Sequence, residues 1–231
     1  MSAETNSTGD EDVEKQEVLR RVAEVGVVPV VRASSAEEAM QVIEAIKEGG
    51  VNVLEITMTV PRAVKVIEQV ADRYGDEVVL GAGTVLDAET ARACILAGAT
   101  FVVSPALNVG TVELCRRYSV AVLPGALTPT EVVTAWQAGA DVVKVFPCGA
   151  LGGAKYLKSL KAPLPQVEMI PTGGVSLKTA AEFIEAGALA LGVGADLVDT
   201  KAIRAGRPEK VTEAARAYVA AVRDARAALN A

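Results

Sequence analysis

The sequence of 231 residues contains no histidine and only 3% aromatic residues. Histidine is the commonest metal ligand and the commonest general base near neutral pH, so any proton transfer must fall to carboxylate, lysine, tyrosine or water. The three cysteines, Cys94, Cys115 and Cys148, are widely spaced and form no CxxC pair, which indicates neither a disulfide framework nor a zinc site. No apolar run approaches the roughly 18 to 20 residues of a membrane helix. We therefore expect no metal, no other cofactor and no membrane partner.

Positive charge is also in short supply. Lysine and arginine total 23 against 29 aspartate and glutamate residues, a net charge of −6 that argues against a nucleic-acid or anionic-membrane partner. Residues 1–15 hold five acidic side chains against Lys15 alone and little apolar material, which predicts a disordered acidic tail. This segment lacks the basic start and apolar stretch of a secretory signal, so we expect a cytoplasmic protein. Residues 16–231 are predicted to form one domain.

A short pattern that joins a helix to a strand occurs four times. In each copy a glycine is followed at once by a run typical of strands, and the four glycines are Gly50, Gly98, Gly139 and Gly187. Glycine supplies the left-handed turn that closes a helix. Successive glycines lie 48, 41 and 48 residues apart. Because that is about twice the length of one β-α unit, a further strand is expected in each interval.

Apolar runs of strand length occur at residues 27–31, 78–81, 120–123 and 168–171, between amphipathic stretches such as 36–47 and 179–185. With the strands after the four glycines they make eight β-α units. Continuously apolar strands that alternate with helices predict an α/β fold with a parallel sheet, and eight units suggest a closed (β/α)8 TIM barrel. An open doubly wound sheet is the alternative, but its dinucleotide fingerprint is absent, because Thr84-Val85-Leu86 follows Gly81-Ala82-Gly83.

Lys144 is the most informative single residue, because it stands alone inside residues 141–147, a run that is otherwise typical of a buried strand. Between Val143 and Val145 an ammonium loses hydration, which disfavours its charged form and makes a nucleophilic amine available for Schiff-base chemistry. The alternative is a lysine at a strand end, with its stem on apolar neighbours and its head in water.

Glu55 is the natural partner of Lys144. It interrupts the apolar run 51–57, where an inward carboxylate is costly unless it is hydrogen-bonded or paired with a cation. Glu55 is either a structural member of an ion pair or, beside a desolvated lysine, a proton shuttle.

Two glycine turns are candidate anion sites, because the active sites of barrels lie where strands end and the following loops begin. Gly173-Gly174 closes the seventh predicted strand, and its N–H groups could face an anion such as phosphate. Gly83-Thr84 closes the third and would suit a carboxylate. Each turn, taken alone, is better explained by steric accommodation.

Together these segments resemble the class I 2-keto-3-deoxy-6-phosphogluconate (KDPG) aldolases, which include the 4-hydroxy-2-oxoglutarate (KHG) aldolases. The resemblance runs from about Val27 to Val198, with its motifs in the family's order. The motifs are Val28-Pro29-Val30-Val31-Arg32, Glu55-Ile56-Thr57-Met58-Thr59-Val60-Pro61, Gly81-Ala82-Gly83-Thr84-Val85, Val103-Ser104-Pro105, Pro124-Gly125, Thr128-Pro129-Thr130-Glu131, Lys144-Val145-Phe146-Pro147 and Pro171-Thr172-Gly173-Gly174-Val175.

The resemblance implies a homotrimer of TIM barrels that cleaves a 2-keto-3-deoxy sugar acid to pyruvate and an aldehyde without a metal. By this resemblance Lys144 forms the Schiff base and Glu55 acts through water as general acid and base. The other residues carried over bind substrate: Thr84 and the Gly83 backbone hold the pyruvyl carboxylate, Pro105 and Phe146 line the pocket, and Gly173, Gly174 and Gly194 receive the phosphate.

The sequence departs from the family pattern at two places. Many members carry an arginine at the position of Thr59, placed to meet the substrate carboxylate, so we expect Arg32, or alternatively Arg62, to supply the positive charge. Members usually have Gly-Ser after the eighth strand, whereas here Gly194 is followed by Ala195 and Asp196. A lost hydroxyl donor costs about 1 kcal/mol and a nearby carboxylate repels a dianion, so phosphate recognition should be weaker.

Two other functions remain alternatives. A noncatalytic trimeric assembly module would use the outer surface of the barrel, although it would have no reason to keep both Lys144 and Glu55. A phosphosugar isomerase or epimerase would suffer from the lack of histidine and metal ligands. We therefore expect a small 2-keto acid substrate.

Overall fold

The computed structural model describes residues 7–230, and the side chains of residues 14–230. Within this range the strands alternate with helices, and every strand pair is parallel. The strands are β1 (Val27–Val31), β2 (Val53–Thr57), β3 (Val79–Gly83), β4 (Phe101–Val103), β5 (Ala121–Leu123), β6 (Gly125–Ala126), β7 (Val143–Val145), β8 (Met169–Pro171) and β9 (Leu191–Val193). The helices are α1 (Ser7–Val25), α2 (Ala36–Glu48), α3 (Ala63–Tyr74), α4 (Ala88–Leu96), α5 (Val109–Arg117), α6 (Pro129–Ala138), α7 (Ala154–Lys161), α8 (Ala180–Glu185), α9 (Thr200–Arg204) and α10 (Glu209–Leu229), with short 3-10 turns η1 (Gly75–Glu77) and η2 (Cys148–Leu151).

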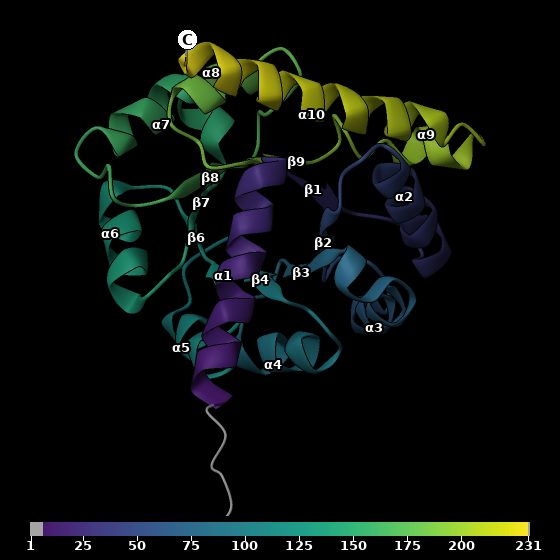
Figure 1. Cartoon of the computed structure of the whole chain (residues 1–231), viewed down its shortest axis with the longest axis horizontal. Helices are drawn as coiled ribbons and strands as arrows, with labels where there is room; N and C mark the ends of the chain where they lie inside the picture. Colours follow the sequence, from purple (N-terminus) through teal and green to yellow (C-terminus); the bar gives the residue numbers. More distant parts are fainter. Residues whose placement is uncertain (1–6, 231) are drawn as a thin grey trace, which may run out of the picture.

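The strands form a sheet of order β5-β4-β3-β2-β1-β9 and a second sheet of order β6-β7-β8. Between the two sheets the chain passes from β5 to β6 through Pro124 alone, and an isolated parallel bridge joins Thr172, just after β8, to Gly192 of β9. The predicted α/β class with parallel strands is confirmed. Seen along the strands, helices α2 to α10 lie around the outside of both sheets (Figure 1).

Each strand separates two apolar clusters because its side chains alternate between faces. Val27, Leu54 and Val102 pack outward against the helices. Their neighbours Val28, Val53 and Val103 pack inward with the other strands. Continuously apolar strands, as the sequence indicated, are thus buried on both faces.

The four predicted helix-closing glycines all have the expected conformation. Gly50, Gly98, Gly139 and Gly187 have φ of 88°, 103°, 96° and 92°, in the left-handed region that favours glycine. Each is followed within a few residues by a strand, as predicted.

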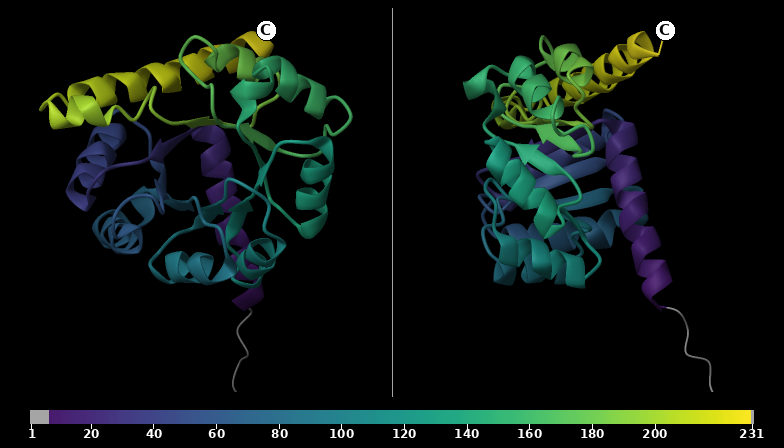
Figure 2. Two further views of the ribbon diagram at one scale, coloured as in Figure 1. Left: turned by 180° about the vertical axis from the view of Figure 1, so that it is seen from behind. Right: turned by 90° about the vertical axis from the view of Figure 1, so that its left-hand side faces the viewer.

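Helix α1 covers one end of the inward-facing cluster. Val18 and Val22 are buried among the inward side chains of the strands, and α1 lies against one end of the strands in the right-hand view of Figure 2. The amine of Lys15 lies 3.0 Å from the carboxylate of Asp141, which precedes β7. The sequence did not predict this helix. The boundary expected between tail and domain, after residue 15, falls within it, and residues 1–6 of the expected tail lie outside the described residues.

No helix within residues 7–230 combines the length and the apolar character needed to cross a membrane.

Candidate active site

Lys144 and Glu55 meet inside the sheets. Lys144 is the central residue of β7 and Glu55 the central residue of β2, and both point to the inward face. Their side chains are 6% and 3% exposed, and the Lys144 Nζ lies 3.6 Å from the Glu55 Oε1. The expected proximity of these two residues is therefore observed. The burial of the Lys144 side chain excludes the alternative in which its amine lies in water.

The pair is close but not hydrogen-bonded. A charge-assisted N–H···O bond is about 2.7–2.9 Å long, so 3.6 Å leaves the two atoms in electrostatic contact only. Glu55 Oε1 has no hydrogen-bond partner among the described residues. A cavity of about 10 Å³ adjoins the pair, the space of roughly one water molecule. Such an unsatisfied buried oxygen is placed to receive a proton donor that enters the site.

The aromatic and glycine residues around the pair fix its position. The Phe146 ring centroid lies 5.5 Å from Lys144 Nζ. A Cβ at Gly83 would come within 2.0 Å of Glu55 Oε1, so the Glu55 carboxyl needs a glycine at this point. The next residue, Thr84, has a φ of 58°, an uncommon value for a β-branched residue that is typical of functional sites. Pro105 is half-buried beyond the end of β4.

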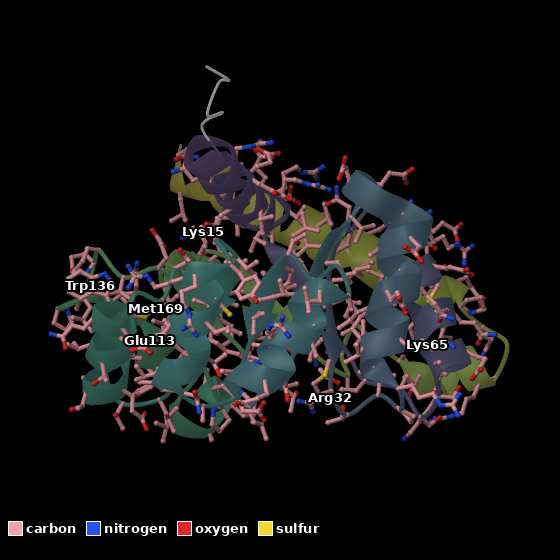
Figure 3. The ribbon with its side chains drawn as sticks, turned by 90° about the horizontal axis from the view of Figure 1, so that it is seen from below. Lys15, Arg32, Lys65, Glu113, Trp136 and Met169 are labelled. Carbon is pink, nitrogen blue, oxygen red and sulfur yellow. The ribbon has the colours of Figure 1, made fainter. Side chains whose placement is uncertain are left out.

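Threonines extend from Glu55 towards the mouth of the site. Thr57 is fully buried, and its hydroxyl bonds to the Val31 carbonyl at 3.0 Å and to the Thr59 hydroxyl at 2.6 Å. Thr59 is exposed beyond the end of β2. Arg32 is exposed after β1, at the end of the molecule opposite Lys15 and α1 (Figure 3). The alternative cation, Arg62, is exposed and has a φ of 60°.

The predicted phosphate residues lie at the carboxyl ends of β8 and β9. Gly173 and Gly174 have φ of 82° and 79°. Across the part of the chain that the structure describes, no hydrogen bond is donated by the backbone N–H of Gly173, Gly174, Gly194 or Ala195. These donors are therefore available to a ligand.

Asp196 is held in place by two partners. Its Oδ2 accepts hydrogen bonds from the hydroxyl of buried Tyr218 at 2.5 Å and from the Leu177 N–H at 3.2 Å. Burial, together with this bond to the carboxylate, raises the pKa of Tyr218, so the phenol stays a donor. The carboxylate expected beside the phosphate loop thus connects that loop to α10.

Sequence reasoning missed Thr172 as a site residue. Its side chain is buried beside the cavity at the Lys144–Glu55 pair, and a Cβ at Gly192 would come within 2.0 Å of its Oγ1. The available signal was alternation, because Ile170 and Thr172 are two residues apart and both line this cavity.

The arrangement suits amine chemistry in a water-poor pocket. It offers one buried amine, one buried carboxyl without a hydrogen bond and free backbone donors near the mouth. No group of three or more aspartate, glutamate or cysteine side chains within the described residues is placed to hold a metal ion.

Comparison with known proteins agrees with the resemblance. The family described as KDPG and KHG aldolase matches residues 18–214. A 2-dehydro-3-deoxy-6-phosphogalactonate aldolase of Escherichia coli is 34% identical, over 86% of this chain and 95% of that protein. A 2-dehydro-3-deoxy-phosphogluconate aldolase of Treponema pallidum is 35% identical, over 84% of this chain and 92% of that protein.

A solved structure has the same fold. It is the KDPG aldolase of Legionella pneumophila, with pyruvate captured at low pH as a covalent carbinolamine intermediate. Its identity is 29% and its TM-score 0.81, over 87% of this chain and 97% of that one. Because the family matches most of the chain and both relatives are at least 34% identical over most of their length, the chain belongs to the KDPG and KHG aldolase family.

Proposed function

We propose that this protein is a class I aldolase that reversibly cleaves a 2-keto-3-deoxy sugar acid to pyruvate and an aldehyde. The observation that carries the proposal is the buried amine of Lys144, 3.6 Å from a buried Glu55 oxygen that has no hydrogen bond within the described residues. An amine so placed can attack a ketone, and a carboxyl so placed can move the protons that the reaction requires.

The reaction begins when Glu55 accepts a proton from Lys144 and leaves a neutral amine. Lys144 Nζ attacks C2 of the substrate to form a carbinolamine, and loss of water, with a proton supplied by Glu55, gives an iminium. The iminium withdraws the electron pair of the C3–C4 bond while Glu55, through a water, takes the proton of the C4 hydroxyl. The aldehyde leaves, and Lys144 carries a neutral enamine.

Glu55 completes the cycle by returning a proton to C3 of the enamine. Water then adds to the resulting iminium of pyruvate, and collapse of the carbinolamine releases pyruvate and the free amine. The carboxyl must reach both protonation states in every turnover, and its unbonded Oε1 is accessible to a bridging water.

The substrate carboxylate is proposed to bind at Gly83 and Thr84, with Arg32 or Arg62 as the cation. Supporting this, a Cβ at Gly83 would lie 2.0 Å from Glu55 Oε1, which places Gly83 beside the pair, and Arg32 lies at the end of the molecule opposite α1 (Figure 3). Pro105 and Phe146 are proposed to line the pocket around the pyruvyl carbons; the Phe146 ring is close to Lys144.

The far end of the substrate is proposed to bind at Gly173, Gly174, Gly194 and Ala195. Their free N–H groups suit a phosphate, so the proposed substrates include 2-keto-3-deoxy-6-phosphogluconate as well as the shorter 4-hydroxy-2-oxoglutarate. Asp196 contributes a negative charge at this loop, which favours unphosphorylated acids.

We further propose that the two sheets close into one eight-stranded barrel, in which β5 and β6 share a single strand position. The parallel bridge between Thr172 and Gly192 supports closure on one side, and the single residue Pro124 between β5 and β6 supports it on the other. Assembly as a homotrimer is proposed from the family resemblance, and a cytoplasmic location from the cysteine pattern and the sequence of the first residues.

The test is chemical trapping. Borohydride added with pyruvate is expected to reduce the Schiff base and fix a stable adduct on the peptide that contains Lys144, detected by mass spectrometry. Lys144→Ala should form no adduct, and Glu55→Gln should form it slowly. Lys158→Ala is the matched control, because Lys158 is an exposed lysine of α7 and should not affect trapping. An unmodified Lys144 peptide in the unsubstituted protein would refute the proposal.

A further inference from the structure

Two threonine hydroxyls near the mouth of the site, those of Thr57 and Thr59, are hydrogen-bonded to each other, and the direction of that bond can be assigned. Thr57 Oγ1 lies 3.0 Å from the Val31 carbonyl oxygen and 2.6 Å from Thr59 Oγ1. Alternation places Glu55 and Thr57 on the same side of β2, and the contact with Thr57 brings Thr59 to that side as well.

The direction of these bonds follows from counting protons. A carbonyl oxygen only accepts, so the single hydroxyl proton of Thr57 is donated to Val31. Thr57 then has only lone pairs for its second contact, and Thr59 must donate its own proton to Thr57. Because Thr57 is fully buried, water does not reach its hydroxyl and both of its contacts are with protein atoms.

We infer that Thr59 presents only a hydrogen-bond acceptor to the active-site mouth and selects substrates that carry a hydroxyl beyond C4. The remaining lone pairs of Thr59 Oγ1 can accept a hydrogen bond from a substrate hydroxyl. A carboxylate or phosphate oxygen has no proton to donate, and Thr59 has none left to donate to it. Thr59 is therefore a specificity residue for a neutral hydroxyl, not a carboxylate ligand, and Thr57 is its positioning residue. Of the two proposed substrates Thr59 favours the sugar acid, because the carbon beyond C4 of 4-hydroxy-2-oxoglutarate is a carboxylate.

The location of Thr59 selects which hydroxyl it meets. Lys144 holds C2 deep in the site, at 6% exposure, whereas Thr59 is exposed beyond the end of β2. The carboxylate is proposed to bind at Gly83, beside Glu55 and deep in the site, so Thr59 faces the fragment that becomes the aldehyde. This inference rests on the proposed function.

The experiment compares two aldehydes in the aldol direction. The protein is supplied with pyruvate and either glyceraldehyde or propanal, which has the same carbon chain without hydroxyls, and pyruvate consumption is followed. Thr59→Val should lower the ratio of kcat/KM for glyceraldehyde to that for propanal by about two- to tenfold, the effect of one hydrogen bond. Borohydride trapping of pyruvate on Lys144 should be unchanged.

Thr57 variants separate positioning from simple packing. Thr57→Val should lower the same ratio, because Thr59 loses the partner that holds its proton away from the mouth, and Thr57→Ser should restore it. A ratio unchanged in Thr59→Val, with trapping intact, overturns the inference alone. Weaker pyruvate trapping in Thr59→Val also overturns it, since Thr59 would then act on the carboxylate. Absence of trapping in the unsubstituted protein overturns the proposed function and this inference together.

Discussion

Gly83→Ala tests whether the Glu55 carboxyl must lie where the structure has it. The added Cβ would lie 2.0 Å from Glu55 Oε1 and 2.5 Å from its Cγ, and ordinary contact begins at 3.4 Å. Oε1 must therefore move by about 1.4 Å. Since a misplacement of about 1 Å can cost about 10²-fold in rate, kcat should fall by roughly that factor, and overpacking should lower the free energy of unfolding by about 1–3 kcal/mol.

Pyruvate release is followed with lactate dehydrogenase to obtain kcat, and the free energy of unfolding of the same variant is measured in urea. Schiff-base trapping on Lys144 should persist at a reduced rate, as in Glu55→Gln, because the added methyl group meets Glu55 and not the lysine. Gly110→Ala is the matched control: Gly110 lies in α5, and the added Cβ would meet Asn108 Oδ1 at 3.4 Å, an ordinary contact, so kcat should not change. Unchanged kcat in a folded Gly83→Ala protein would refute the role assigned to the position of Glu55.

Three further predictions concern buried groups. Lys144→Met should lower the free energy of unfolding, measured in urea, by about 3–5 kcal/mol because it leaves the buried Glu55 carboxylate unpaired. Adding Glu55→Leu should recover most of this loss; no recovery would show that the unpaired carboxylate is not its cause. Burial raises the pKa of Glu38, but hydrogen bonds from Ser34 and the ion pair with Arg204 lower it more, to a net value below the usual 4.5. The ionised Glu38 therefore stabilises the fold fully above pH 4.5, and this stabilisation is lost as the pH falls through the lower folded pKa. The difference in urea midpoint between the unsubstituted protein and Glu38→Gln should shrink as the pH falls below 4.5, and a difference that stays constant would contradict this. Burial raises the pKa of Cys148 to about 11, so iodoacetamide at pH 8 should label it slowly in the native protein and rapidly in urea, and equal rates would argue against burial.

Local patterns predicted much of the fold. A glycine with no Cβ penalty closes a helix wherever the chain must turn sharply, and Gly50 and Gly139 do so with positive φ. The proximity of Lys144 and Glu55 was predictable because each is a lone charge in an apolar strand, where burial requires a partner. Their roles, like those of the other proposed site residues, remain predictions.

Long-range contacts account for what the sequence did not predict. Helix α1 begins in an acidic segment with few apolar residues, and it packs through Val18 and Val22 onto strands that follow it in the chain. Asp196 meets Tyr218, 22 residues away, a partner that no local pattern indicates. Likewise, the acceptor character of Thr59 depends on the carbonyl of Val31, which belongs to another strand.

The closure of the strand interior by α1 has a consequence for the order of events in turnover. Helix α1 covers the end of the strands opposite Arg32 (Figures 2 and 3), and its Val18 and Val22 are buried in the inward cluster, so substrates and products are expected to enter and leave at the end near Arg32. In the proposed mechanism pyruvate is bonded to Lys144, deep in the site, and cannot depart past an aldehyde that still occupies the passage above it. The kinetics should therefore be ordered, with the aldehyde released first and pyruvate last, and pyruvate should inhibit cleavage competitively with the sugar acid.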